Sequence, residues 1–136
     1  MEFQRKSNQK IRDYNKLWME RLANSELLLR EKMTLFWANH FSIEADIVSY
    51  GNYVFNHHDT IRKNCLGNFK QLIKLITIDA GMLRYLNGYL NTNTAPDENY
   101  ARELQELFTV GKDNAVQFSE ADVKAAARVL TGWRIN

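Results

Sequence analysis

The chain has 136 residues, a formal net charge of +2, 45% hydrophobic residues and 25% charged residues. This length favours a single domain spanning residues 1–136, and the composition excludes an intrinsically disordered chain. The small net charge argues against a nucleic-acid partner, and no apolar run approaches the ~20 residues that a membrane-spanning helix needs.

Helix-breaking residues are scarce, with one proline and six glycines in the whole chain. Apolar residues recur about once per helical turn, and no segment alternates as a strand would. The sequence therefore predicts an all-α fold, a compact multi-helix orthogonal bundle of about six to seven helices.

The first predicted helix covers about residues 7–22. Its expected apolar face contains Ile11, Tyr14, Trp18 and Leu22. The second begins after Ser25, a residue type that favours the N-cap, and ends near His40. Its apolar residues form one stripe of Leu29, Met33, Phe36, Trp37 and His40, and another of Leu28 and Leu35. A helix that is apolar on two sides is expected to lie between other elements.

The middle of the chain is less regular. Residues 42–57 give a weak helical prediction because of Gly51, and residues 59–78 are predicted as a helix that Gly67 could split. A short helix over residues 81–86 is expected to end before Asn87-Gly88. The adjacent His57 and His58 have polar neighbours, so the sequence favours a surface position for both.

Two further helices are predicted near the C-terminus. The first starts at Pro96, a residue type favoured in a first helical turn, and ends before Gly111. The second starts at Ser119, because Ser119 and Asp122 have the spacing of a capping box.

The helix after Pro96 carries a polar strip opposite its predicted core face. That core face contains Tyr100, Leu104, Leu107 and Phe108. Arg102 lies nearly opposite it, four residues from both Glu98 and Glu106, and can pair with either.

Glu103 is the carboxylate of this strip nearest the apolar boundary, where burial can raise a carboxyl pKa. One hypothesis makes Glu103 a general acid/base or a metal ligand, supported by Asn99 or Glu106. The alternative is a solvated helix flank stabilised by intrahelical ion pairs.

His40 lies within an apolar stripe and is interpreted either as a hydrogen-bonded core histidine or as a ligand or base. No metal-binding, phosphate-binding or nucleophile-elbow motif occurs, so the sequence predicts neither a metal site nor a cofactor. Cys65, the single cysteine, is predicted to be a buried, inert thiol.

Several segments follow one another in the order of a known family signature. They are Arg30-Glu-Lys-Met33, Phe36-Trp-Ala-Asn-His-Phe41, and residues 61–62, 66–69, 82–86, 98–111, 122–123, 125–128 and 130–133. This series resembles the bacterial domain of unknown function 1800 family over about residues 28–133. One departure is Ala38, which stands where the family has the first histidine of its Phe-Trp-His-Asn-His-Phe block, so a two-histidine site there would be lost.

The resemblance implies an internal piece of a longer bacterial protein, often exported or associated with the cell envelope, and it implies no reaction. The family motif includes Glu98, Asn99, Arg102, Glu103 and Glu106, so this polar face is expected either to pack against other parts of the protein or to line a site.

Two functional hypotheses follow. The first is a scaffold or interaction module whose partner is the remainder of its own chain or another protein. The second is a hydrolase-like or metal-dependent enzyme in which His40, Arg102 and Glu103 are catalytic and Asn99, Glu98 and Glu106 bind ligand. The enzyme hypothesis predicts that His40 and Glu103 converge on one pocket.

Overall fold

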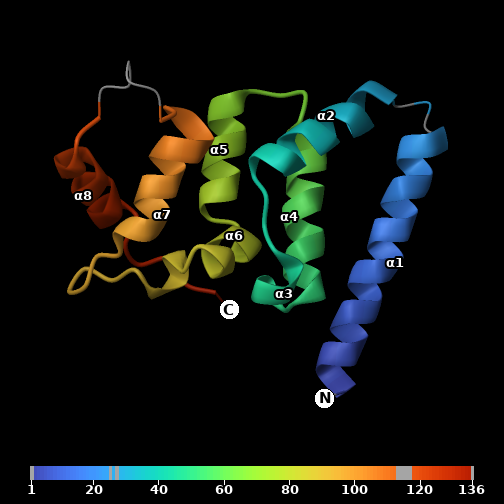
Figure 1. The fold of residues 1–136 in the computed structure, drawn as a ribbon, viewed down its shortest axis with the longest axis horizontal. Coiled ribbons are helices and arrows are strands. Elements are labelled where there is room, and N and C mark those ends of the chain that lie inside the picture. The colour runs from blue at the N-terminus through green and yellow to red at the C-terminus, as the bar shows by residue number, and fades with distance from the viewer. Residues whose placement is uncertain (1, 25, 27, 113–117, 136) are drawn as a thin grey trace. The chain divides into compact units, whose positions relative to one another are not determined.

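The computed structural model describes residues 2–24, 26, 28–112 and 118–135 (Figure 1). The predicted all-α fold is confirmed, since these residues form helices and contain no strand. The chain divides into two compact units, Met1–Gly81 and Met82–Asn136. In the described residues no helix is both long enough and apolar enough to cross a membrane.

The first unit is arranged around α4. Its helices are α1 (Glu2–Asn24), α2 (Leu28–His40), α3 (Ala45–Val48), α4 (Gly51–Asn64) and α5 (Phe69–Thr77). Helix α4 contacts each of the other four, and α1 and α2 also contact one another (Figure 1). The break between α4 and α5 confirms the predicted split near Gly67, and Asn68 begins α5 by accepting a hydrogen bond from the Gln71 amide.

Gly51 begins α4 instead of interrupting a helix. A Cβ atom at this position would lie 2.9 Å from the Ser7 carbonyl oxygen of α1, so glycine permits the close approach of the two helices. The Ser7 hydroxyl accepts a 2.6 Å hydrogen bond from the Gly51 amide and donates to the Ser49 carbonyl. Residue 51 therefore fixes the start of α4 against α1.

The predicted apolar faces of α1 and α2 agree with the observed burial to different degrees. The α1 face is confirmed, since Ile11, Tyr14, Trp18 and Leu22 are half-buried among mostly exposed neighbours. The prediction for α2 is confirmed only in part: Met33, Trp37 and His40 are half-buried, but Leu29 and Phe36 are exposed. The most deeply buried residues of α2 are Glu31 and Thr34, both 0% exposed. The predicted N-cap Ser25 lies outside the described residues.

Polar contacts with the C-terminal end of α4 explain the orientation of α2. Glu31 forms an ion pair with Arg62, whose Nε and Nη2 atoms lie 2.9 and 2.6 Å from Glu31 Oε1. The Arg30 side chain donates to the Arg62 carbonyl, and the Trp37 indole donates to the Cys65 carbonyl. Helix α2 thus satisfies carbonyl groups that the end of a helix leaves without intrahelical partners.

The second unit packs α7 against α8. Its elements are most of α6 (Ala80–Tyr85), a short 3-10 helix (Gly88–Leu90), α7 (Glu98–Glu103), a π-helical segment (Leu104–Thr109) and α8 (Glu120–Val129). The predicted capping box of α8 is present, with Ser119 and Asp122 bonded reciprocally. Gly111 has a φ of 98° and follows the π-helical segment, as the predicted helix stop requires.

Two details of the α7 prediction are wrong. Pro96 precedes the helix, because Asp97 is the N-cap and accepts a hydrogen bond from the Asn99 amide. On the predicted core face Tyr100 and Phe108 are buried, but Leu107 is exposed. The wider π-helical turn, which starts at Leu104, changes the angular spacing on which the prediction depended.

Candidate functional site

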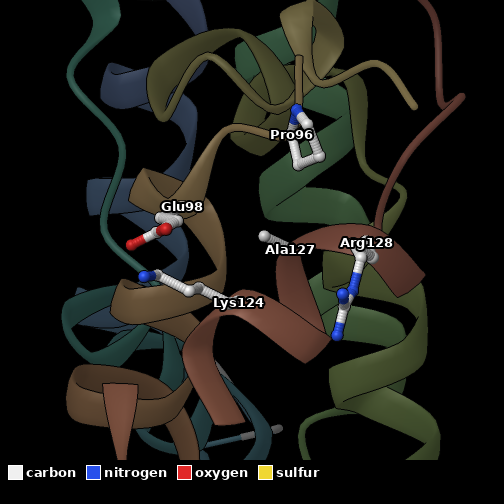
Figure 2. Close-up of a pocket in the computed structure, with 5 residues that line it drawn as sticks. All are labelled: Pro96, Glu98, Lys124, Ala127 and Arg128. Carbon is white, nitrogen blue, oxygen red and sulfur yellow. The ribbon is translucent and has the colours of Figure 1, made fainter. Parts of the chain in front are cut away.

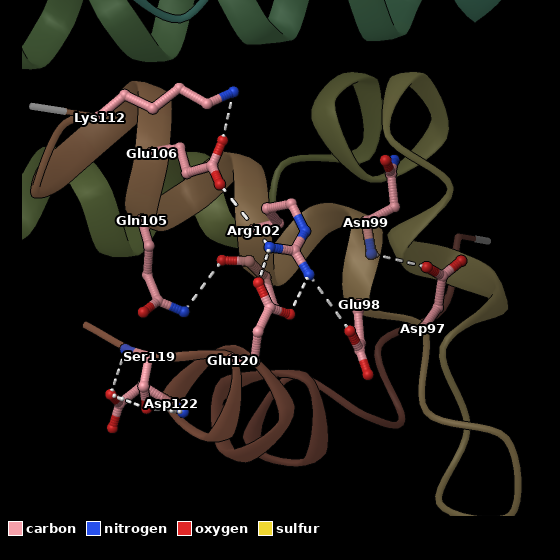
Figure 3. Close-up of polar contacts among 11 residues, drawn as sticks. Asp97, Glu98, Asn99, Arg102, Gln105, Glu106, Lys112, Ser119, Glu120 and Asp122 are labelled. Atoms are coloured by element: carbon pink, nitrogen blue, oxygen red, sulfur yellow. Dashed lines mark hydrogen bonds and ion pairs between the residues drawn. The ribbon is translucent and has the colours of Figure 1, made fainter.

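Arg102 of α7 lies among three carboxylates (Figure 3). Its Nη1 and Nη2 atoms donate to Glu120 of α8 over 2.8 and 2.7 Å. They also lie 3.7 Å from Glu106 and 3.4 Å from Glu98, which confirms both predicted ion pairs. The contact with Glu120 could not be read from helical spacing, because it joins two helices.

The charges of this network stabilise one another. The hydrogen bond to Glu120 is the main cause that raises the pKa of Arg102, and the same bond lowers the pKa of Glu120. Lys112 lies 2.6 Å from Glu106, and this contact raises the pKa of the Lys112 amine. An ionised Glu120 held by a guanidinium favours linking α7 to α8 over proton transfer.

The other predicted residues of this face have separate surroundings. Asn99 donates from its side-chain amide to the Leu86 carbonyl at 3.1 Å. Glu103 is half-buried, and its charge contributes to raising the pKa of Lys112. His40 is half-buried in α2 of the first unit, whereas Glu103 belongs to the second. A site shared by His40 and Glu103 therefore stays a prediction.

A cleft of about 240 Å³ lies between the start of α7 and the turn of α8 that contains Lys124, Ala127 and Arg128 (Figure 2). Its lining residues are Pro96, Glu98, Lys124, Ala127 and Arg128. In Figure 2 the head groups of Glu98 and Lys124 lie on one side of the Ala127 methyl group, and Arg128 lies on the other. The cleft thus joins two cationic groups and one carboxylate over a small apolar floor.

Asn91 holds the loop that forms one wall of this cleft. It is 1% exposed, and its side chain donates to the Ala127 carbonyl at 2.8 Å and accepts from the Asp97 amide at 3.0 Å. The two bonds fasten the segment containing Pro96 and Glu98 to α8. Asn91 was not predicted as a site residue, because it lies in a polar segment typical of an exposed loop.

His57 and His58 are buried, so the prediction that they lie at the surface is wrong. The His57 ring contacts the Phe41 carbonyl oxygen through Nε2 at 2.8 Å and Asp79 Oδ1 through Nδ1 at 2.9 Å. A carbonyl and a carboxylate are both acceptors, so this geometry favours an imidazolium that donates from both nitrogens. His57 and Asp79 then form a buried ion pair.

His58 has a different environment from its neighbour. Its Nδ1 atom is hydrogen-bonded to the Tyr14 hydroxyl, and the centroid of its ring lies 4.0 Å from the ring centroid of Trp18. Burial is the main cause that lowers the pKa of His58 to about 4 and raises the pKa of Tyr14 to about 12. These directions favour a neutral imidazole that accepts a hydrogen bond from the phenol.

The histidines could have been placed from the sequence by a different division of the helices. His58 and Ile61 of α4 recur at helical spacing with Cys65, the C-cap residue of this helix, and all three are buried. The predicted helices, residues 42–57 and 59–78, divide this segment next to His57, so the recurrence does not appear within either of them. The predicted burial of Cys65 is confirmed at 3% exposure. In the described residues no three histidine, cysteine or carboxylate side chains form a group that could hold a metal ion.

The outer face of α2 is apolar and exposed. Its large side chains, 40–66% exposed, are Leu28, Leu29, Leu35 and Phe36. At 100° per residue these four positions, together with the exposed Lys32 and Asn39, occupy an arc of roughly 120°. Helix α2 thus buries polar residues on one side and exposes apolar residues on the other.

A family model described as "Protein of unknown function (DUF1800)" matches residues 1–136. No curated protein matches the chain, and no solved structure matches it either. The match thus brings no reaction, ligand or partner with it.

Proposed function

Because the chain belongs to this family of unknown function, we propose from its surfaces that it is a helical interaction module that binds a protein through the outer face of α2. One observation carries this proposal: Leu28, Leu29, Leu35 and Phe36 remain 40–66% exposed on one side of a single helix. Contiguous exposed apolar side chains mark contact surfaces more often than single ones do.

The opposite side of α2 is held firmly against α4. The exposure of the apolar side chains therefore does not come from a loosely packed helix. Glu31 and Thr34 are completely buried, and Glu31 is paired with Arg62 of α4. Rotating α2 to bury its leucines would expose the apolar contacts of Trp37 and break that ion pair. The polar contacts therefore hold the apolar face outward.

The exposed arc also indicates the chemistry of the partner. Lys32 lies in the middle of the arc, one helical turn from both Leu28 and Phe36. A partner must offer apolar side chains around a central group that accepts the ammonium charge. An amphipathic helix of a second protein, with a carboxylate opposite Lys32, meets both requirements.

A pair of labelled peptides tests this proposal. Both are short amphipathic helices with a leucine stripe, and they differ only in a central glutamate or lysine. We expect fluorescence anisotropy to show tighter binding of the glutamate peptide, loss of binding in Leu29→Gln/Phe36→Gln, and reversed peptide preference in Lys32→Glu.

The matched control is Leu17→Gln/Met19→Gln, which changes two exposed apolar residues of α1. This control should leave peptide binding unchanged. Equal losses in the α1 and α2 variants would contradict the proposal, because binding would then depend on general surface hydrophobicity.

The alternative function is an enzyme site formed by His40, Arg102 and Glu103, with Asn99, Glu98 and Glu106 near the ligand. Arg102 supports it least, because its guanidinium is already shared among Glu98, Glu106 and Glu120. Elemental analysis separates the two functions. A stoichiometric metal that is lost in Glu103→Ala would favour the enzyme.

A further inference from the structure

The cleft beside α8 has an excess of positive charge. Lys124 and Arg128 lie one helical turn apart in α8, and Glu98 is the one carboxylate among the five lining residues. Arg102 already compensates part of the Glu98 charge at 3.4 Å. Within the part of the chain that the structure describes, neither Lys124 nor Arg128 lies within 4 Å of a carboxylate, although the Lys124 charge contributes, after Arg102, to lowering the pKa of Glu120.

Like charges one turn apart on a helix repel one another, so this placement lowers the intrinsic stability of α8. An anion in the cleft would relieve the repulsion. A guanidinium presents two parallel N–H groups that match the two oxygens of a carboxylate, and a lysine ammonium adds a second donor. Arg128 therefore suits an organic carboxylate, and Lys124, on the other side of the Ala127 methyl group, suits a second oxygen of the same ligand (Figure 2).

Glu98 adds a second requirement for the ligand. Its carboxylate faces the same cleft and can only accept hydrogen bonds when ionised (Figure 2). A ligand that is anionic throughout would be repelled by Glu98. A ligand with a carboxylate at one position and a hydroxyl at another satisfies both sides of the cleft.

The walls of the cleft are already held in place. Asn91 fastens the loop with Pro96 to the Ala127 carbonyl, and Arg102 holds Glu98 while also bonding Glu120 of α8. Binding therefore requires little reordering of the backbone. We propose that this cleft binds a small hydroxycarboxylate, with its carboxylate on Arg128 and its hydroxyl accepting from Lys124 and donating to Glu98.

Three named probes test the proposal by amide and arginine side-chain chemical shifts. L-malate and succinate differ by one hydroxyl group, and inorganic phosphate is an anion without a carboxylate. We expect malate to bind more tightly than succinate or phosphate, with shifts centred on Lys124, Ala127 and Arg128. Arg128→Gln should weaken malate binding about tenfold, the loss expected when a charge-assisted hydrogen bond is removed.

Glu98→Gln separates the role of the hydroxyl group, since it should reduce the preference for malate over succinate. Lys112→Gln is the matched control, because it removes a cation of the same unit that pairs with Glu106 outside the cleft. Equal binding of malate, succinate and phosphate would overturn the proposal. So would the absence of binding, or an equal loss of affinity in Lys112→Gln and Arg128→Gln.

Discussion

Two adjacent histidines in α4 are buried against different hydrogen-bond partners. His57 faces a carbonyl and the Asp79 carboxylate, whereas His58 faces the Tyr14 hydroxyl and the Trp18 ring. Consecutive helical residues point about 100° apart, so neighbours in sequence can meet different partners. Protonation of His58, whose pKa is lowered mainly by burial, is therefore expected to destabilise the folded protein.

We expect Asp79→Asn to lower the free energy of unfolding by about 3 kcal/mol, because it leaves the buried His57 cation without its counter-charge. Urea denaturation at pH 7 measures this loss. Asp59→Asn is the control, because Asp59 pairs with the exposed Lys63 and should cost less than about 1 kcal/mol. Equal losses in the two variants would show that His57 is neutral.

His58 should make the protein less stable in mild acid. The folded state holds the pKa of His58 at about 4, whereas an unfolded histidine titrates near 6.5. Between these values the unfolded chain binds the extra proton, so stability should fall by up to about 3 kcal/mol as the pH is lowered from about 6.5 to 4.

Unfolding free energies measured across this pH range test the assignment to His58. In His58→Gln the acid-dependent loss should shrink, because the titrating group is gone. An unchanged pH dependence in this variant would assign the effect to other groups.

At the level of elements, the contact of α1 with α4 depends on a glycine. A methyl group on residue 51 would approach the Ser7 carbonyl at 2.9 Å. We expect Gly51→Ala to destabilise the protein by about 1–3 kcal/mol, although alanine has the better helix propensity. Thermal or urea denaturation measures the change.

Gly67→Ala is the matched control for this substitution. Gly67 is exposed, and the atom nearest to its added Cβ would be the local Asn64 carbonyl oxygen at 3.2 Å. Its effect should be smaller than that of Gly51→Ala, because no second helix lies against it. A stabilising effect of Gly51→Ala would contradict the close helix approach.

At the level of the whole molecule, the prediction of a single domain means that the two units should unfold together. Each unit is small, and a small unit buries a limited fraction of its surface. We therefore expect residues 1–136 to unfold in one transition. Asn91→Ala provides the perturbation, since it leaves the Asp97 amide and the Ala127 carbonyl unpaired and should cost about 2 kcal/mol.

Native-state hydrogen exchange reports whether this loss reaches the first unit. In a cooperative molecule the most protected amides of α4 lose the same free energy as those of α8. A loss confined to Met82–Asn136 would show two independently folding domains.

The sequence alone determined the all-α fold and the local features of its helices. The capping box at Ser119, the stop at Gly111 and the pairing of Arg102 with Glu98 and Glu106 all depend on residues within about one or two turns. Local spacing fixes such features, because helical geometry places these residues side by side wherever the helix lies.

Only the tertiary structure decided which faces are buried and which polar residues meet. Asp79 reaches His57, Arg62 reaches Glu31, and Glu120 reaches Arg102 across 18 or more positions in the sequence. Ion pairs between helices can outweigh apolar periodicity, and for this reason α2 buries Glu31 and exposes Phe36. A pattern within one helix carries no information about the charge that a second helix brings to it.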